Sequence, residues 1–151
     1  MSRCFIQVIF LGMMISALGC NPEYDTSEIV DTVPVSGVLT YQGKPLEFYQ
    51  VVLMPVDGTR VAVGVTDAQG KFKLGTNDGG DGAPPGDAKI AVSFVGPPSS
   101  VEPGTEQVID DPSKLPKPKI KIPAKYADPA TSGLTQNVPA GGLTDLKLDL
   151  Q

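Results

Sequence analysis

The amino-acid sequence predicts an all-β protein: an antiparallel β-sandwich of about seven strands that follows a signal peptide. Gly (17) and Pro (15) make up about a fifth of the 151 residues, which disfavours helices and suits short strands joined by tight turns. From about residue 35 onward, apolar and polar residues alternate with period two in several separate stretches, as in half-buried strands. Two packed sheets would bury the apolar faces of these strands, and the length fits one domain.

Residues 1–19 predict a lipoprotein signal peptide. Arg3 precedes an apolar run of about 14 residues, which is too short to span a bilayer comfortably. The run ends in Ala17-Leu18-Gly19-Cys20, which resembles the bacterial lipobox, with Leu18 one place later than usual. The resemblance implies that Cys20 is lipidated and becomes the first residue of the mature chain. The alternative is an ordinary secretory signal or a marginal membrane anchor.

The cysteine content agrees with a lipoprotein. Of the two cysteines, Cys4 lies in the segment that would be removed and Cys20 would carry the lipid, so the mature chain has no stray thiol in an oxidising compartment. Several acyl chains give firm membrane attachment. Asn21 follows the cysteine where the inner-membrane retention signal of such lipoproteins has Asp, so the resemblance favours the outer membrane or the cell surface.

Residues 20–32 follow as the lipidated cysteine and a flexible acidic tether. This stretch is polar, carries several acidic side chains and has no sustained period. It is expected to hold the domain, residues 33–151, away from the membrane.

The first half of the domain predicts strands with clear inward faces. Val35, Leu39 and Tyr41 share one face, and the turn that follows contains Gly43, which is free to take a positive φ. The later inward faces consist of Tyr49, Val51 and Leu53 before Pro55, of Phe72 and Leu74, and of Ile90, Val92 and Phe94 within residues 87–94.

Further strands are expected from the same alternation. Val61, Val63 and Val65 alternate with Ala62, Gly64 and Thr66, and a turn follows in which Asp67 hydrogen-bonds backbone amides and Gly70 is left-handed. Residues 134–138 predict a short strand. The clearest half-buried strand has Leu146, Leu148 and Leu150 alternating with Asp145, Lys147 and Asp149.

A long interval rich in Gly and Pro, residues 95–119, cannot belong to a tight meander. It is expected either to be a mobile excursion at one end of the sandwich or to pack across an edge.

Four motifs carry a resemblance to a known family. They are the hairpin at residues 36–46 (SGVLTYQGKPL), the T-D-x-x-G-x-F turn at 66–72, the Pro-Gly turn into a strand at 82–90, and the pair 122–126 (IPAKY) and 131–135 (TSGLT). In this order they resemble carboxypeptidase regulatory-like domains, the last pair a subgroup of short bacterial lipoproteins. The resemblance covers about residues 33–151. It implies a transthyretin-related, immunoglobulin-like sandwich with an accessory, adhesive or stability role.

The composition argues against catalysis and against nucleic-acid binding. The chain has no His, the commonest general base and metal ligand. Hydrolases of the transthyretin-related type need histidines and a different C-terminal tail, so that activity is not expected. The pI of about 4.6 disfavours phosphate neutralisation along nucleic acid.

The best candidate for a cation site is the loop at residues 77–82 with the following strand. Asp78, Asp81 and Asp87 supply oxygen ligands next to glycines, as Ca²⁺ prefers. The spacing is not that of an EF-hand, and Asn, Asp and Gly also form ordinary turns. Weak Ca²⁺ binding is therefore one hypothesis and a solvated loop the other; no other cofactor is expected.

The segment 114–125 holds five lysines between prolines. Lys117, Lys119 and Lys121 predict a contact with a polyanion, while the alternative is an extended, soluble segment whose Ile120 and Ile122 pack on the sandwich edge. Trp is absent, so a glycan platform is thinly supported. The sequence thus predicts a non-catalytic, lipid-anchored envelope protein with a structural or protein-binding role; the alternative is a carbohydrate- or calcium-binding module.

Overall fold

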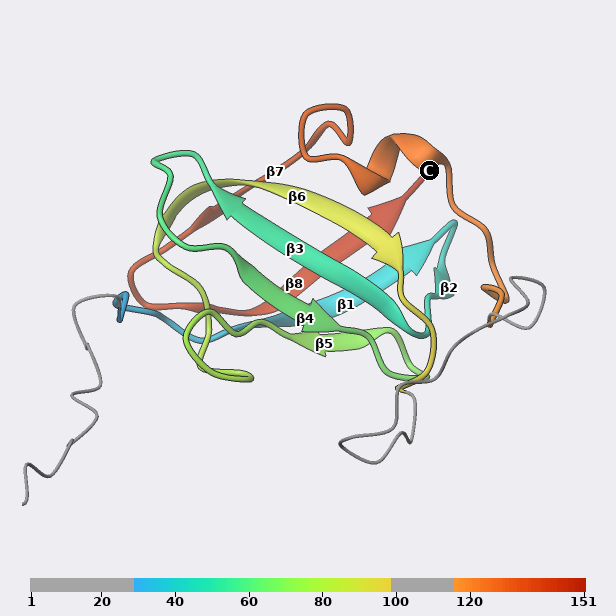
Figure 1. The fold of residues 1–151 in the computed structure, drawn as a ribbon, viewed down its shortest axis with the longest axis horizontal. Helices are drawn as coiled ribbons and strands as arrows, with labels where there is room; N and C mark the ends of the chain where they lie inside the picture. Colours follow the sequence, from blue (N-terminus) through green and yellow to red (C-terminus); the bar gives the residue numbers. More distant parts are fainter. Residues whose placement is uncertain (1–28, 99–115) are drawn as a thin grey trace, which may run out of the picture.

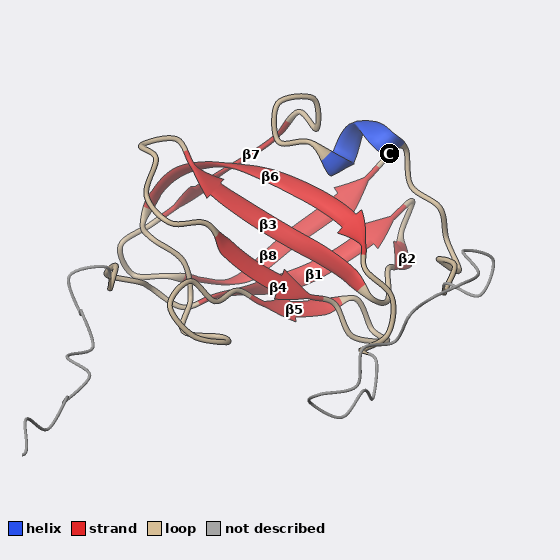
Figure 2. Ribbon diagram, viewed as in Figure 1, coloured by secondary structure: helices blue, strands red, loops and turns tan. Residues whose placement is uncertain are grey.

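The computed structural model describes residues 29–98 and 116–151 and places them in eight strands and one short 3₁₀ helix (Figure 1). The strands form two four-stranded sheets, and loops make most of the remainder (Figure 2). The all-β prediction is therefore confirmed. The predicted signal peptide, Cys20 and most of the interval 95–119 lie outside the described residues. In the part that is described, no helix has the length and apolar character needed to cross a membrane.

The first sheet, called here the β1 sheet, is built around β1 (Val35–Tyr41). β5 (Lys71–Lys73) and the two-residue β2 (Lys44–Pro45) pair with one side of β1, both antiparallel. β8 (Leu143–Leu150) pairs with the other side and runs parallel to β1. The wholly antiparallel prediction is wrong at this pair, because period-two patterning reports which face is buried and says nothing of strand direction.

The second sheet, called here the β3 sheet, is antiparallel throughout. Its order is β4 (Ala62–Val65), β3 (Tyr49–Pro55), β6 (Gly86–Phe94) and β7 (Leu134–Val138). β6 is the longest strand and pairs with all seven residues of β3. The predicted strands at 87–94 and 134–138 are confirmed.

A hydrophobic core lies between the two sheets. The buried faces of β1, β3, β6 and β8 are those that the alternation predicts, and Tyr49 meets Phe94 edge to face with ring centroids 5.3 Å apart. Tyr41 and Phe94 are half-buried and pack against the core. The fully or almost fully buried apolar residues include Leu39, Val51, Leu53, Leu74, Ile90, Val92, Leu146, Leu148 and Leu150.

The buried face of β4 is the opposite of the apolar one. Ala62 and Gly64 point inward, while Val65 is 49% exposed. A Cβ placed on Gly64 would lie 2.3 Å from the backbone oxygen of Lys73, so the inner face of β4 has no room for a larger side chain. β4 here approaches β5 of the other sheet closely, and this approach makes the valine side the outer face.

Two turns have the backbone expected from their glycines. Gly43 has φ 74° and Gly70 has φ 73°. The Asp67 carboxylate accepts hydrogen bonds from the N–H groups of Gln69 and Lys71, each at 2.9 Å. The turn that joins β4 to β5 is thereby fixed as predicted.

Residues 116–133 lie along the edge of the two sheets. Ile120 and Ile122 pack against the core, and the Tyr49 hydroxyl donates to the backbone oxygen of Ile120. The 3₁₀ helix η3 (Ala124–Ala127) follows, and the hydroxyl of its buried Tyr126 donates to the backbone oxygen of Gln151 at 2.8 Å. These contacts belong to residues after the interval 95–119, of which residues 99–115 lie outside the described part, so the two expectations for that interval stay predictions.

The described end of the predicted tether is held to the domain. Val30 N–H donates to Asn77 Oδ1 at 3.1 Å, and Thr32 Oγ1 donates to the backbone oxygen of Asp81 at 3.0 Å. The contacts of the domain therefore include residues before 33, because the loop at 77–82 offers hydrogen-bond partners to Val30 and Thr32.

Candidate functional site

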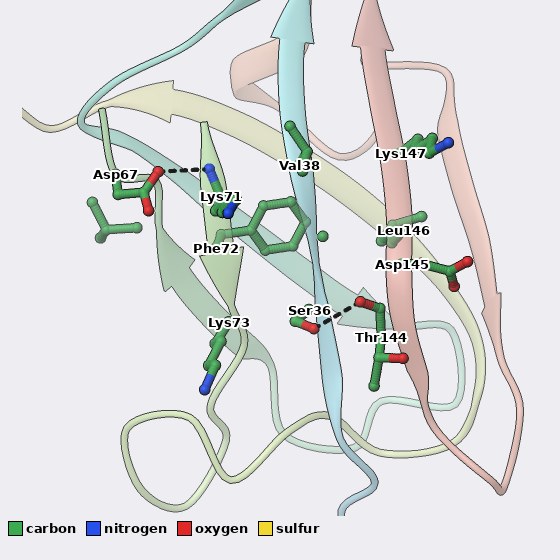
Figure 3. A pocket seen from close by; sticks show the side chains of 12 residues that line it. Ser36, Val38, Asp67, Lys71, Phe72, Lys73, Thr144, Asp145, Leu146 and Lys147 are labelled. Carbon is green, nitrogen blue, oxygen red and sulfur yellow. Dashed lines mark hydrogen bonds between the residues drawn. The ribbon is translucent and has the colours of Figure 1, made fainter. Parts of the chain in front are cut away.

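The outer face of the β1 sheet carries a hollow of about 550 Å³, called here the lysine trough. Its lining comes from β1, from Val65 at the end of β4, from β5 with the turn before it, and from the first half of β8. Figure 3 views it from outside, with β1 in front, β5 on one side and β8 on the other. The residues used below to define it are Ser36, Val38, Lys71, Lys73, Asp145 and Lys147.

The floor of the trough is narrow and firmly built. Val38 stands at its centre, half-buried (Figure 3). The Ser36 hydroxyl donates to the backbone oxygen of Thr144 at 3.0 Å, which ties β1 to β8. Between Ser36 and Val38, the position of Gly37 leaves no room for a side chain, because a Cβ there would lie 2.2 Å from the backbone oxygen of Leu146.

The strand register places three lysines around this floor. Val38 pairs with Lys71 on one side and with Lys147 on the other, and Ser36 pairs with Lys73. Neighbouring strands lie about 4.8 Å apart, so the backbones of Lys71 and Lys147 are about 10 Å apart with Val38 between them. All three lysine side chains are exposed, which leaves their ammonium groups accessible to a ligand.

Two acidic residues also line the trough, and they differ in what their carboxylates do. Asp67 is directed to its own turn, where it accepts the two backbone N–H bonds described above. Asp145 is exposed on β8 at the end of the trough near Thr144 (Figure 3). Lys71 and Lys73 therefore make the β5 side of the trough cationic, while the β8 side carries both Lys147 and Asp145.

The predicted cation ligands do not meet in one place. Asp78 accepts the N–H of Gly79 at 2.7 Å, and Asp87 accepts the side-chain amide of Asn137 at 2.7 Å. Within residues 29–98 and 116–151, no three His, Cys, Asp or Glu side chains are placed to hold a metal ion.

Asp81 instead holds its own loop together. Its carboxylate accepts the backbone N–H of Thr76 at 2.7 Å and both the backbone and side-chain N–H groups of Asn77, at 3.1 and 3.0 Å. Desolvation raises the pKa of Asp81, but these hydrogen bonds together outweigh it and bring the pKa below its ordinary value. The sequence interpretation of this loop as a turn accounts for these contacts.

The predicted polyanion contact is only partly assembled. Lys117, Lys119 and Lys121 are exposed, but Lys119 forms an ion pair with Glu47. Ile120 and Ile122 lie between them and face the core. This is the geometry of the extended-segment alternative, with lysines on the solvent side.

Two of the described tyrosines are not accessible as a glycan platform. Tyr49 and Tyr126 are buried, with their hydroxyl groups on backbone oxygens, while Tyr24 lies outside the described residues. Burial raises the pKa of Tyr49, and a backbone hydrogen bond from Ile122 offsets part of this. Both rings are thus used to hold the 120–126 segment and the C-terminus on the sheets.

The lysine trough was not predicted from the sequence. The alternation in residues 71–73 and 145–149 indicates that Lys71, Lys73 and Lys147 point outward. That these distant segments flank one stretch of β1 follows only from the sheet topology, including the unpredicted parallel pairing of β8.

Comparison with protein-family models, with curated proteins and with solved structures gave no match.

Proposed function

We propose that this protein is a non-catalytic, lipid-anchored component of the bacterial cell envelope that binds another envelope protein through its two-sheet domain. The observation that carries the proposal is the lysine trough, a hollow on the outer face of the β1 sheet. Lipid on Cys20 would hold the chain at the outer membrane or cell surface, with residues 21–29 linking the anchor to the domain.

The fold we propose is a β-sandwich of the carboxypeptidase regulatory-like, transthyretin-related kind. The resemblance in the motifs supports it, since the turns at Gly43 and Gly70 have the expected positive φ and β6 begins at Gly86 of the Pro-Gly motif. Such a domain fixes a scaffold and leaves the function to its surfaces.

The groups in the trough suit binding better than catalysis. Ser36, the hydroxyl at its floor, already donates to a backbone oxygen, and its lysine neighbours on β5 and β8 are exposed ammonium groups. A nucleophile needs an adjacent base held within hydrogen-bonding reach. Exposed cations beside an apolar floor instead give steering and specificity in protein recognition.

The test is cross-linking in native cells, followed by affinity capture of the tagged protein and mass spectrometry. We expect a reproducible protein partner, lost when Cys20→Ser removes the lipid anchor. A second sample carries Lys71→Gln, Lys73→Gln and Lys147→Gln, and should lose the same partner while keeping the anchor. Recovery of wall glycan alone, or of no partner, would overturn the proposal.

The anchor itself is tested by metabolic labelling with a fatty-acid analogue. Label should appear on the wild-type chain and be absent from Cys20→Ser, with Cys4→Ser as the matched control that keeps the label. Label that persists in Cys20→Ser would contradict the lipoprotein assignment.

A further inference from the structure

We propose that the lysine trough binds an extended acidic segment of the partner protein, with acidic side chains at alternate positions. This inference rests on the proposed function and names the chemistry of the partner. It is carried by the positions of Lys71, Lys73 and Lys147 around Val38.

The spacing of the β5 lysines sets the spacing of the acids. Lys71 and Lys73 are two residues apart on one strand and lie on its outer face, on either side of the buried Phe72. Their backbones are therefore separated by about 6.6 Å. An extended peptide has the same two-residue repeat, so carboxylates at positions i and i+2 face these two ammonium groups together.

The centre and far side of the trough complete the fit. A peptide that lies along β1 with its acidic side chains toward β5 turns its intervening side chains toward Lys147 on β8. These intervening side chains also contact the half-buried Val38. Three cations thus lie around one apolar contact, an arrangement that favours an acidic peptide over a neutral one.

Asp145 distinguishes the two sides of the trough. It lies on β8, two residues before Lys147, with its side chain exposed. A carboxylate of the ligand placed beside Asp145 would meet a like charge, so the acidic side chains of the segment lie on the β5 side of β1, facing Lys71 and Lys73. Removal of this charge should strengthen binding.

A peptide fits better than an anionic membrane. The lysines border a recess whose floor is Val38, and a membrane surface is too broad to enter between two strands that flank a third.

The experiment measures fluorescence anisotropy of labelled five-residue peptides with the purified full-length protein in a neutral detergent. The first peptide alternates Glu and Val with Glu at positions 1, 3 and 5. The second has the same composition with its three Glu adjacent, and the third has Gln in place of Glu. We expect the alternating peptide to bind at least threefold more tightly than the adjacent one, and the Gln peptide not to bind.

Two triple variants with equal changes of charge locate the site. Lys71→Gln, Lys73→Gln and Lys147→Gln together should weaken binding of the alternating peptide about tenfold, because Lys71 and Lys73 each face a carboxylate of the peptide and Lys147 adds positive charge across Val38. Lys44→Gln, Lys89→Gln and Lys125→Gln, which lie outside the trough, should change it less than twofold. Asp145→Asn should strengthen it two- to threefold. Unchanged thermal unfolding of each variant shows that the fold is retained.

Three results would overturn the inference. They are equal weakening by both triple variants, preference for the adjacent-Glu peptide, and displacement of the peptide by a short-chain phosphatidylglycerol at equal or lower concentration, which would indicate a lipid headgroup. If the captured partner is reproducible while the peptides fail, the acidic-segment inference falls and the proposed function stands. If capture fails as well, both fall.

Discussion

Two residues other than glycine adopt the left-handed backbone conformation between β1 and β3. Gln42 has φ 51° and Phe48 has φ 61°. Gln42 and Gly43 together form the two-residue turn between β1 and β2, where a positive φ at both positions matches the twist of the strands. Phe48 is held at the start of β3 by backbone bonds with Thr66 and Val95. The strain at Phe48 is therefore fixed by the β4 and β6 neighbours of β3.

Replacing Gln42 by Asn should stabilise the protein. Asn tolerates the left-handed region better than Gln and forms the favoured Asn-Gly pair of this turn type, so we expect a gain of about 0.5–1 kcal/mol in the free energy of unfolding. Urea denaturation measures it. Gly43→Ala should act in the opposite direction, because Gly43 has φ 74°. A loss of stability in Gln42→Asn would contradict the turn geometry.

Asp81 is the acidic side chain whose removal should cost most in the loop at 77–82. Asp81→Ala leaves three N–H groups of Thr76 and Asn77 without their acceptor, for an expected loss of about 1–2 kcal/mol. Asp78→Ala is the control, since its carboxylate accepts only the neighbouring Gly79 N–H in the described chain, and it should change the urea midpoint little. Millimolar Ca²⁺ should leave the melting temperature of both variants and of the wild type unchanged. A rise of several degrees in the melting temperature of the wild type alone would support Ca²⁺ binding at this loop.

At the scale of the strands, β4 marks the limit of what periodicity can predict. The alternation correctly indicates a strand at 62–65, but the apolar side of that strand faces outward. A pattern that contains Val on one face and Ala and Gly on the other gives the valine face the higher hydropathy. The approach of β5, which excludes a Cβ at Gly64, reverses that order, and it is a property of the tertiary structure. β6 and β8 have large apolar side chains on one face only, and β3 has its largest apolar side chains, Tyr49 and Leu53, on its inner face, so the inward faces of these strands are predicted correctly.

Gly64→Ala should therefore be strongly destabilising. The added methyl group would meet the Lys73 backbone oxygen at 2.3 Å and push β4 away from β5, for an expected loss of about 2–3 kcal/mol. Gly79→Ala, where a Cβ meets nothing within 4 Å, is the matched control and should cost less than about 0.5 kcal/mol. Thermal unfolding of the two variants compares them. Equal melting temperatures would show that β4 and β5 can separate at little cost.

The C-terminal end of β8 depends on one tyrosine. The Tyr126 hydroxyl donates to Gln151 O at 2.8 Å and accepts from Gln151 N at 3.1 Å. Tyr126→Phe keeps the buried ring and removes both bonds, so we expect a loss of about 1–2 kcal/mol and faster amide exchange in the last residues of β8. Tyr41→Phe is the control, because no hydrogen bond of its hydroxyl is found among the described residues. Unchanged exchange near Leu150 in Tyr126→Phe would contradict this role.

For the whole molecule, the carboxylates predict a loss of stability in acid. A hydrogen bond from the Thr59 side chain lowers the pKa of Asp57, one from the Thr40 side chain lowers that of Asp149, and the Asp81 pKa is lowered as described above. Each folded-state pKa lies below the ordinary value of 3.8, so this stabilisation is present above that value and is lost as the pH falls through the folded pKa. The urea midpoint should therefore vary little from pH 7 to 5 and fall below pH 4.

The matched variant for this pH dependence is Asp81→Asn combined with Asp149→Asn. It should lose less stability than the wild type between pH 5 and 3, because two of the three shifted groups no longer titrate. An identical acid loss in both proteins would assign the effect to other carboxylates.

The parallel pairing of β1 with β8 affects how the protein reaches its folded state. β1 pairs with β2 and β5 on one side, and its whole other side pairs with β8, with Tyr41 opposite Leu150. A polypeptide that is translated or threaded through a pore from its N-terminus cannot complete this sheet until the final segment emerges. Contacts between such distant segments also slow folding. We therefore expect the core to stay incomplete until β8 has been synthesised, and then to close in a single late step.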